Sequence, residues 1–324
     1  MQNGNAVVGG SSTQDISYSR RRPGSPTPDS NNVSKKARYS PSSSRPTTSN
    51  GMPAPLKPLS LSILGVEPLD EFIKEIADFI HNRIAARPPD LEGQIEVEAK
   101  LGVLKYREAD VRVAFPVRSE TIIASDDHRF ESNMTAIQHK HFNTQLNSLE
   151  AASRQPEHPT SPIRYQHSYL IDSFHPTDGS DKIRVTRDEK TGEVKECMKK
   201  IRLGSLDIFS PKNNADWRVS VNLEVPVAQP LGNATFTRRK DRMSYSHEEF
   251  LIDLTQVTQS SGPGSQQIMH ELEVEFARPS VLMSTAAVRG DPNVSPLERD
   301  AFDELVRAFV NNVRILVRNT RPPQ

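Results

Sequence analysis

The stretches IEVEAKL at residues 95–101 and HELEVEF at residues 270–276 decide the fold. Successive side chains of a β-strand point to opposite faces of a sheet, so each stretch separates apolar residues from charged ones. The charged face of the first stretch is Glu, Glu and Lys, and that of the second is three glutamates. Both stretches therefore predict β-strands with one buried face and one strongly charged face.

The region between these stretches repeats the period of two, which predicts a series of consecutive strands. Lys190-Thr191-Gly192 has the composition of a hairpin turn, and residues 258–267 predict a flexible connection. We expect strands at residues 94–104, 164–174, 182–187, 194–203, 217–225, 235–245, 249–257 and 268–276.

Three segments follow a helical period instead. Apolar residues recur at helical spacing over residues 68–84, and a second helix is expected over residues 134–152. In that helix His139 and His141 lie two positions apart and do not face each other, so we expect surface side chains rather than metal ligands. The third helix begins at residue 295 with the sequence SPLE, a capping box with proline at the first helical position.

The charged faces favour a closed barrel. For any single strand, an ordinary sheet with one solvated face is the default interpretation. Here two faces are mainly acidic, whereas Arg238, Lys240 and Arg242 share a purely basic face. Three glutamates on one face repel each other unless cations compensate them. We therefore expect these faces to line a common lumen, with the apolar faces outside and covered by helices.

Such a lumen suits phosphate chemistry. Carboxylates without His or Cys are hard oxygen donors, suited to Mg²⁺ or Mn²⁺, and Lys and Arg bind phosphate oxygens. Hydrolysis of a phosphoanhydride also needs an oriented water, which a carboxylate such as Glu224 can hold. The chain has no glycine-rich phosphate loop and no Cys-x₅-Arg signature, so Cys197 is interpreted as a packed residue rather than a nucleophile.

Composition excludes several other classes of protein. The chain has 324 residues, of which 35% are hydrophobic, and no apolar run is long enough to span a bilayer. Its single cysteine excludes an internal disulfide and fits a reducing, intracellular compartment. The 41 basic and 41 acidic side chains balance, but residues 1–50 carry a net charge of about +5. The remainder is therefore acidic, which argues against broad non-specific binding of nucleic acid.

The N-terminal segment is predicted to be separate from the folded part. Residues 1–58 are rich in Ser and Pro and poor in large apolar side chains, which predicts a disordered tail before a catalytic domain at residues 59–324. Basic clusters at residues 20–22 and 35–38 have the spacing of a bipartite nuclear-import signal. A solvated basic tail is the alternative interpretation of these clusters.

Taken together, the charged segments resemble the fungal RNA 5′-triphosphatases, the β subunits of the mRNA-capping enzyme among the triphosphate tunnel metalloenzymes. A lone E-x-E-x-K recurs by chance in charged strands, but two acidic strands with a basic strand between them form a specific pattern. The resemblance covers residues 60–320 and rests on the segments 96–100, 238–242, 253–255 and 271–275.

The resemblance implies an α+β, mainly β fold: a closed eight-stranded antiparallel tunnel barrel with flanking helices. It implies metal-dependent removal of the γ-phosphate from the 5′-triphosphate end of nascent pre-mRNA, the first step of cap formation, and hence a nuclear protein. Glu96, Glu98 and Glu275 are the implied ligands of Mg²⁺ or Mn²⁺.

The resemblance also implies roles for the other charged residues. Glu224 would position the attacking water, Asp253 would hold basic side chains, and Glu271 and Glu273 would belong to the same acidic wall as the metal ligands. The implied phosphate contacts are Arg184, Lys200, Arg238, Lys240 and Arg242. Solvated charges are the alternative interpretation of Lys100, Lys199 and Arg218.

Two other functions stay open at this point. One is a tunnel enzyme that hydrolyses inorganic triphosphate, nucleoside triphosphates or polyphosphate; the other is a catalytically silent tunnel that only binds polyphosphate or RNA ends. The expected partners are 5′-triphosphate RNA, the capping guanylyltransferase or the RNA polymerase II tail, and a second copy of the chain, with no membrane. Some relatives dock through a Trp-containing linker, but the only tryptophan here, Trp217, lies in an expected strand.

Overall fold

The computed structural model describes residues 57–322 except positions 69, 178, 180 and 261–265. The chain divides into two units, Met1–Gly65 and Val66–Gln324. In the first unit the described residues, 57–65, form neither a helix nor a strand. The basic clusters of the predicted tail lie outside the described residues, so the predicted disorder and the import signal stay predictions.

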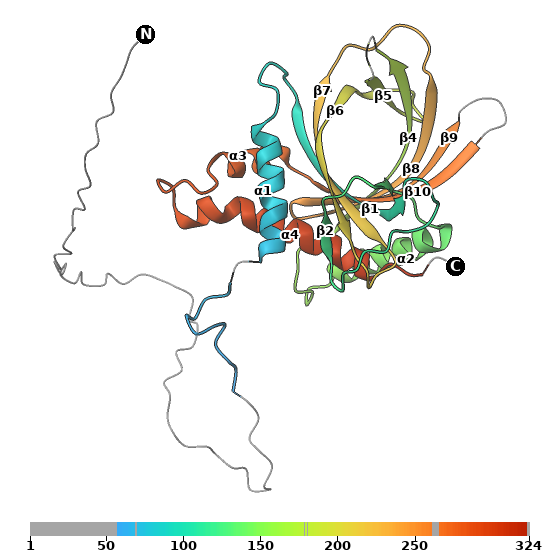
Figure 1. Ribbon diagram of the computed structural model, residues 1–324. Helices are drawn as coiled ribbons and strands as arrows, with labels where there is room; N and C mark the ends of the chain where they lie inside the picture. Colours follow the sequence, from blue (N-terminus) through green and yellow to red (C-terminus); the bar gives the residue numbers. More distant parts are fainter. Residues whose placement is uncertain (1–56, 69, 178, 180, 261–265, 323–324) are drawn as a thin grey trace, which may run out of the picture. The chain divides into compact units, whose positions relative to one another are not determined.

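The second unit contains a closed antiparallel barrel (Figure 1). In the described part of the chain, ten strands form one sheet, and all but β2 and β3 enter the barrel, in the order β1-β7-β6-β5-β4-β8-β9-β10 with β10 pairing back to β1. The predicted eight-stranded tunnel is therefore confirmed. The barrel strands are β1 (Gln94–Tyr106), β4 (Arg164–Pro176), β5 (Lys182–Asp188), β6 (Val194–Phe209), β7 (Asp216–Pro226), β8 (Phe236–His247), β9 (Phe250–Ser260) and β10 (Gln266–Phe276).

Apolar side chains on the outer face of the barrel pack against helices and form the core. Ala99 of β1, Val221 of β7 and Val274 of β10 are fully buried. They belong to one hydrophobic cluster with Phe302 and Phe309 of the C-terminal helix. Because the apolar faces of the strands pack outward against helices, their charged faces point into the lumen. The helices are α1 (Glu71–Ala85), α2 (Ala136–Ser153), α3 (Pro279–Ala287) and α4 (Pro296–Arg318).

The helix starts follow the expected capping chemistry. Ser295 accepts from the backbone N–H of Glu298, whose side chain accepts in return from the N–H of Ser295, so the predicted capping box is present. Asp70 caps α1 through bonds from the N–H groups of Phe72 and Ile73, which is why this helix begins after the predicted residue 68. These side chains satisfy N–H groups that have no partner within a helix.

Several element boundaries differ from the prediction. The short strands β2 (Thr121–Ile123) and β3 (His128–Glu131) and the helix α3 were not expected. Strand β6 continues to Phe209 because a bulge between Arg202 and Gly204 shifts the alternation without ending the pairing. Residues 258–260 and 266–267 of the expected connection are strand, since Ser260 pairs with Gln266, and residues 261–265 lie outside the described residues.

The two histidines of α2 are half-buried rather than exposed, which corrects the expected surface placement. The ring of His139 lies 4.7 Å from that of His270, centroid to centroid, and Nε2 of His141 lies 3.0 Å from the carbonyl oxygen of Asn319. Burial, with the neighbouring His270, lowers the pKa of His139 to about 4. The helix packs more closely on the sheet than its weak amphipathic pattern suggests.

A glycine allows β3 to pack on β1. A Cβ atom on Gly102 would lie 2.3 Å from the carbonyl oxygen of Glu131 and 2.7 Å from the ring of Phe130. We expect Gly102→Ala to lower the free energy of unfolding by about 1–3 kcal/mol in denaturant titrations, because backbone atoms must move. Gly179→Ala is the matched control, since no atom lies within 4 Å of its Cβ position. Equal stability of the two variants would contradict this account.

Candidate active site

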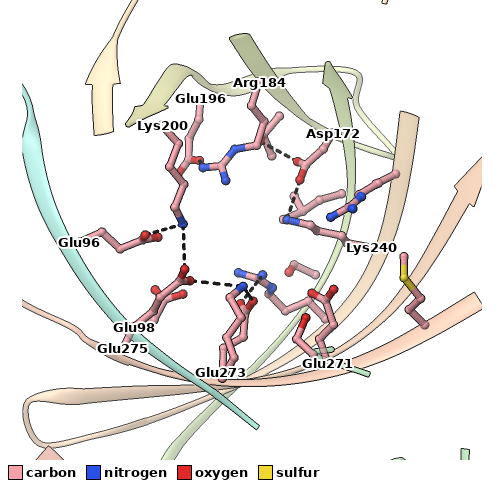
Figure 2. Close-up of a pocket in the computed structure, with 18 of the residues that line it drawn as sticks. Glu96, Glu98, Asp172, Arg184, Glu196, Lys200, Lys240, Glu271, Glu273 and Glu275 are labelled. Carbon is pink, nitrogen blue, oxygen red and sulfur yellow. Dashed lines mark hydrogen bonds and ion pairs between the residues drawn. The ribbon is translucent and has the colours of Figure 1, made fainter. Parts of the chain in front are cut away.

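The lumen of the barrel is a charged cavity of about 1050 Å³ (Figure 2). Acidic side chains enter it mainly from β1, β7 and β10, and basic side chains enter it mainly from β5, β6 and β8. This is the arrangement that the alternating charged faces predicted. The predicted site residues that line it are Glu96, Glu98, Arg184, Lys200, Glu224, Arg238, Lys240, Arg242, Glu271, Glu273 and Glu275.

Three predicted ligands gather where the barrel closes. Glu98 of β1 lies opposite Glu275 of β10 in the antiparallel pairing. Glu96 precedes Glu98 by two residues and therefore lies on the same face of β1. One carboxylate oxygen from each of the three lies within 4.8 Å of the others. Asp253, Glu273 and Glu275 form a second group with the same spacing. Both groups offer the hard oxygen donors that suit a divalent cation.

The members of the two groups differ in whether a cation pairs with their carboxylate. Burial raises the pKa of Glu275 well above its usual value, and the carboxylates of Glu273 and Glu96 add to the effect. In the described part of the chain, Glu275 forms no ion pair. Glu273 instead pairs with Lys100 and, at 3.4 Å, with Arg242, and these cations lower its pKa in spite of burial. Glu275, which both groups share, is therefore the member without a cation partner in the described chain. Glu96, Glu98 and Glu275 all line the lumen, whereas Asp253 of the second group does not, so the group of Glu96, Glu98 and Glu275 fits a metal ion better.

An amide that the sequence analysis missed supports this group. Nδ2 of Asn222 donates to Glu96 at 2.9 Å and to Glu98 at 3.2 Å. Asn222 is buried and lies across from Glu96 in the pairing of β7 with β1. Lys200 pairs with the same two carboxylates. The only signal in the sequence was that Asn222 shares its strand face with Glu224.

Buried carboxylates aim the basic side chains of β8 into the lumen. Nζ of Lys240 lies 2.6 Å from Asp172, and Arg242 lies 2.6 Å from Asp253. Asp172 was missed because one aspartate in an otherwise ordinary strand gave no charge pattern. Asp253 does not line the cavity but lies beneath Arg242, fully buried, as expected for a residue that holds a basic side chain.

Arg184 and Arg238 reach the lumen from two other positions. Arg184 of β5 donates to Glu224 of β7 at 3.2 Å, so these two predicted residues meet across the cavity wall. Arg238 donates to the amide oxygen of Gln259 at 2.9 Å. The chemical roles of the site residues stay predictions, although the structure brings them together.

The structure separates the three basic residues that could be either lumen residues or solvated charges. Lys100 and Arg218 line the lumen, where Arg218 is held by Asp207 at 2.6 Å. Lys199 does not line it and pairs with Asp181 at 2.8 Å, which fits the solvated interpretation. Cys197 is half-buried, and burial raises the pKa of its thiol, so it is a poor nucleophile.

In sequence and in structure, this chain is similar to proteins of mRNA capping. The family model described as "mRNA capping enzyme, beta chain" matches residues 66–322. The mRNA-capping enzyme subunit beta of Schizosaccharomyces pombe is 36% identical over 80% of this chain and 85% of its own length. The structure of S. pombe Pct1 RNA triphosphatase superimposes with a TM-score of 0.74 at 34% identity, over 82% of this chain and 100% of that one. Pct1 in complex with the Spt5 CTD gives 0.73 at 35% identity over the same shares.

Removal of one carboxylate tests the cation site without relying on activity. We expect Glu275→Gln to weaken Mn²⁺ binding by at least about tenfold in calorimetric titrations, because a ligand is lost. In metal-free buffer the same variant should melt at a higher temperature than the wild type, since one buried carboxylate no longer repels its neighbours.

Glu271→Gln is the matched control, because Glu271 lies on the same strand face but belongs to neither carboxylate group. It should bind Mn²⁺ with nearly wild-type affinity. If Glu271→Gln weakened binding and Glu275→Gln did not, the ligand assignment would be wrong.

Proposed function

Because this chain belongs to the family of mRNA-capping enzyme β chains and is an RNA 5′-triphosphatase, we propose that its lumen removes the γ-phosphate from the 5′-triphosphate end of nascent pre-mRNA with Mg²⁺ or Mn²⁺ as the cofactor. The observation that carries the proposal is the pair of facing walls: clustered carboxylates on β1 and β10, and aimed cations on β5, β6 and β8. A triphosphate is the ligand that needs both a metal and several cations.

Glu96, Glu98 and Glu275 would hold the metal. The uncompensated carboxylate of Glu275 supports this assignment, and the donor set consists of oxygens only, as Mg²⁺ and Mn²⁺ prefer. When bound, the ion neutralises charge on the phosphate and makes phosphorus more open to attack.

The cations of the lumen would bind the triphosphate. Arg184, Lys200, Arg238, Lys240 and Arg242 present guanidinium and ammonium groups from three strands, and guanidinium groups bind phosphate oxygens in pairs. Their buried partners hold several of them in place before the substrate arrives, so little reorganisation is needed during the reaction. Burial lowers the pKa of Lys240 although Asp172 pairs with it, so an anionic substrate would favour its charged form.

Glu224 would act on water. Its carboxylate faces the lumen between Arg184 at 3.2 Å and Lys200 at 4.0 Å, in a position to orient a water and accept its proton. The water oxygen would bond to the γ-phosphorus while the bond from that phosphorus to the β–γ bridging oxygen breaks. The products are phosphate and an RNA that ends in a diphosphate.

Partners and location follow from the relatives. The S. pombe relative is named as a subunit of the capping enzyme, and Pct1 has been solved with the Spt5 CTD. We infer that this chain works in the nucleus with the capping guanylyltransferase or with a repetitive tail of the transcription machinery. Homodimerisation stays a prediction. None of the described helices is long and apolar enough to cross a membrane.

The reaction itself gives the first test. The full chain should release phosphate from RNA labelled in the γ-phosphate when Mg²⁺ or Mn²⁺ is present, and chelator should abolish the release. Turnover of inorganic triphosphate with none of triphosphate-ended RNA would move the protein to the alternative function, a hydrolase of small polyphosphates. The absence of turnover on both substrates would leave only a binding role.

A second prediction isolates Glu224. We expect Glu224→Gln to lower kcat on RNA by about 100-fold or more, because proton transfer contributes on that order. The amide should keep hydrogen bonding to Arg184, and Mn²⁺ affinity should stay within about twofold of the wild type, since Glu224 is outside the carboxylate groups. A kcat near that of the wild type would contradict the role proposed for Glu224.

A further inference from the structure

An aromatic strip follows the outside of β4 and ends at the rim of the lumen. It consists of Tyr165, His167 and Tyr169, which alternate along the strand and therefore share a face. Their ring centroids are 6.4 Å apart for Tyr165 and His167 and 4.6 Å apart for His167 and Tyr169. The rings are tilted by 47° and 38°, so they form a ladder rather than a closed stack.

Two cations accompany the aromatic strip. Nζ of Lys190, in the β5–β6 hairpin, lies 5.3 Å from the centre of the Tyr169 ring, and the guanidinium carbon of Arg239 lies 5.8 Å from it. The hairpin holds Lys190 there, because Oδ1 of Asp188 accepts from the N–H of Lys190 at 3.0 Å. The N–H of Glu189 also donates to the carbonyl oxygen of Tyr169 at 2.9 Å.

Strand β4, which carries the aromatic strip, lies on the side of the barrel away from α1, α3 and α4 (Figure 1). Tyr165 is 42% exposed, and the side chain of Arg239 is 44% exposed. His167, Tyr169 and Lys190 also line the lumen, so the strip continues the wall of the cavity to the outer surface. A nucleic-acid chain that leaves the lumen on this side would contact the strip.

Exposed rings with interspersed cations are suited to single-stranded nucleic acid. Bases stack on aromatic faces, and backbone phosphates contact Lys and Arg. Two acidic residues fix the ladder: Asp241 lies 2.6 Å from Nε2 of His167, and Glu189 lies 2.6 Å from Nε of Arg239. We propose that the aromatic strip binds the first nucleotides of the RNA whose triphosphate occupies the lumen. The proposal rests on the proposed RNA 5′-triphosphatase function.

A second aromatic cluster at the lumen is less suited to this role. Phe174 and Phe236 stack on each other with centroids 4.5 Å apart and planes at 10°. Nζ of Lys182 lies 4.6 Å from the Phe236 ring, and Arg238 lies over both rings. These faces already contact each other and the two cations. Tyr165, whose ring centroid lies 5.2 Å from that of Tyr245, is still 42% exposed.

The aromatic strip would distinguish RNA from small triphosphates. Inorganic triphosphate fills only the lumen, whereas an RNA would also contact the strip. Loss of one stacked base weakens binding of single strands by about fivefold to 150-fold. The strip should therefore affect KM for RNA and leave turnover of inorganic triphosphate unchanged.

The test compares Tyr165→Ala, Arg239→Ala and the control Arg278→Ala on two substrates. The substrates are triphosphate-ended RNA of about ten nucleotides and inorganic triphosphate. Tyr165 of the strip and its accompanying cation Arg239 do not line the lumen. Arg278 forms an exposed ion pair with Glu249 and does not line the lumen either. We expect Tyr165→Ala to raise KM for RNA about tenfold. For Arg239→Ala, the salt dependence of log KM should fall by about 0.7. Neither variant should change kcat or KM for inorganic triphosphate, and Tyr165→Phe should restore binding.

Binding of the same RNA with a 5′-hydroxyl end, followed by fluorescence anisotropy, separates the two proposals. Weaker binding by Tyr165→Ala and Arg239→Ala, but not by Arg278→Ala, supports the aromatic strip even if no phosphate is released from RNA. The absence of phosphate release would reject the proposed function alone. Unchanged RNA binding and unchanged KM for RNA in both strip variants would overturn the proposed role of the strip. A parallel loss on RNA and inorganic triphosphate would overturn it as well, because it would indicate a damaged lumen.

Discussion

The pairing of β1 with β10 is the constraint on which the rest of the site depends. It closes the barrel and places Glu98 opposite Glu275, so carboxylates from the first and the last strand meet inside one lumen. Buried like charges raise the free energy of the folded state unless cations compensate them. Lys100, Lys200 and Arg242 compensate part of this charge, but Glu275 has no such partner in the described chain. The folded barrel therefore favours the binding of a cation where β1 pairs with β10.

The opposite wall of the lumen applies the same principle with the signs reversed. Buried Asp172 and Asp253 hold Lys240 and Arg242 in the orientation that a polyanion needs. The cost of burying these groups is met during folding, so binding energy need not be spent on arranging them. An acidic wall for the metal and a basic wall for the phosphates together favour a triphosphate over a monophosphate. The packed helices outside keep the strands, and hence these distances, fixed.

The sequence was sufficient to predict the closed barrel and most charged residues of the lumen, because alternation assigns each side chain to a face. Strand faces of largely one sign are favoured when acidic and basic faces point toward each other, which a closed barrel allows. Asn222 and Asp172 could not be predicted, since an isolated polar residue in a strand has many structural explanations. The predicted strand ends at residue 203, six residues before the end of β6, because the bulge at Arg202 interrupts the period of two. Strands β2 and β3 could not be predicted because they are too short to show a period. The half-burial of His139 depends on its contact with His270, which is distant in sequence.

The position of the metal tests the central claim most directly. Crystals soaked in Mn²⁺ and measured at the manganese absorption edge would show the ion as an anomalous peak. We predict one strong peak inside the lumen, within coordination distance of Glu96, Glu98 and Glu275. A peak between Asp253 and Glu273 without contact to Glu96 and Glu98, or no peak in the lumen, would contradict the account.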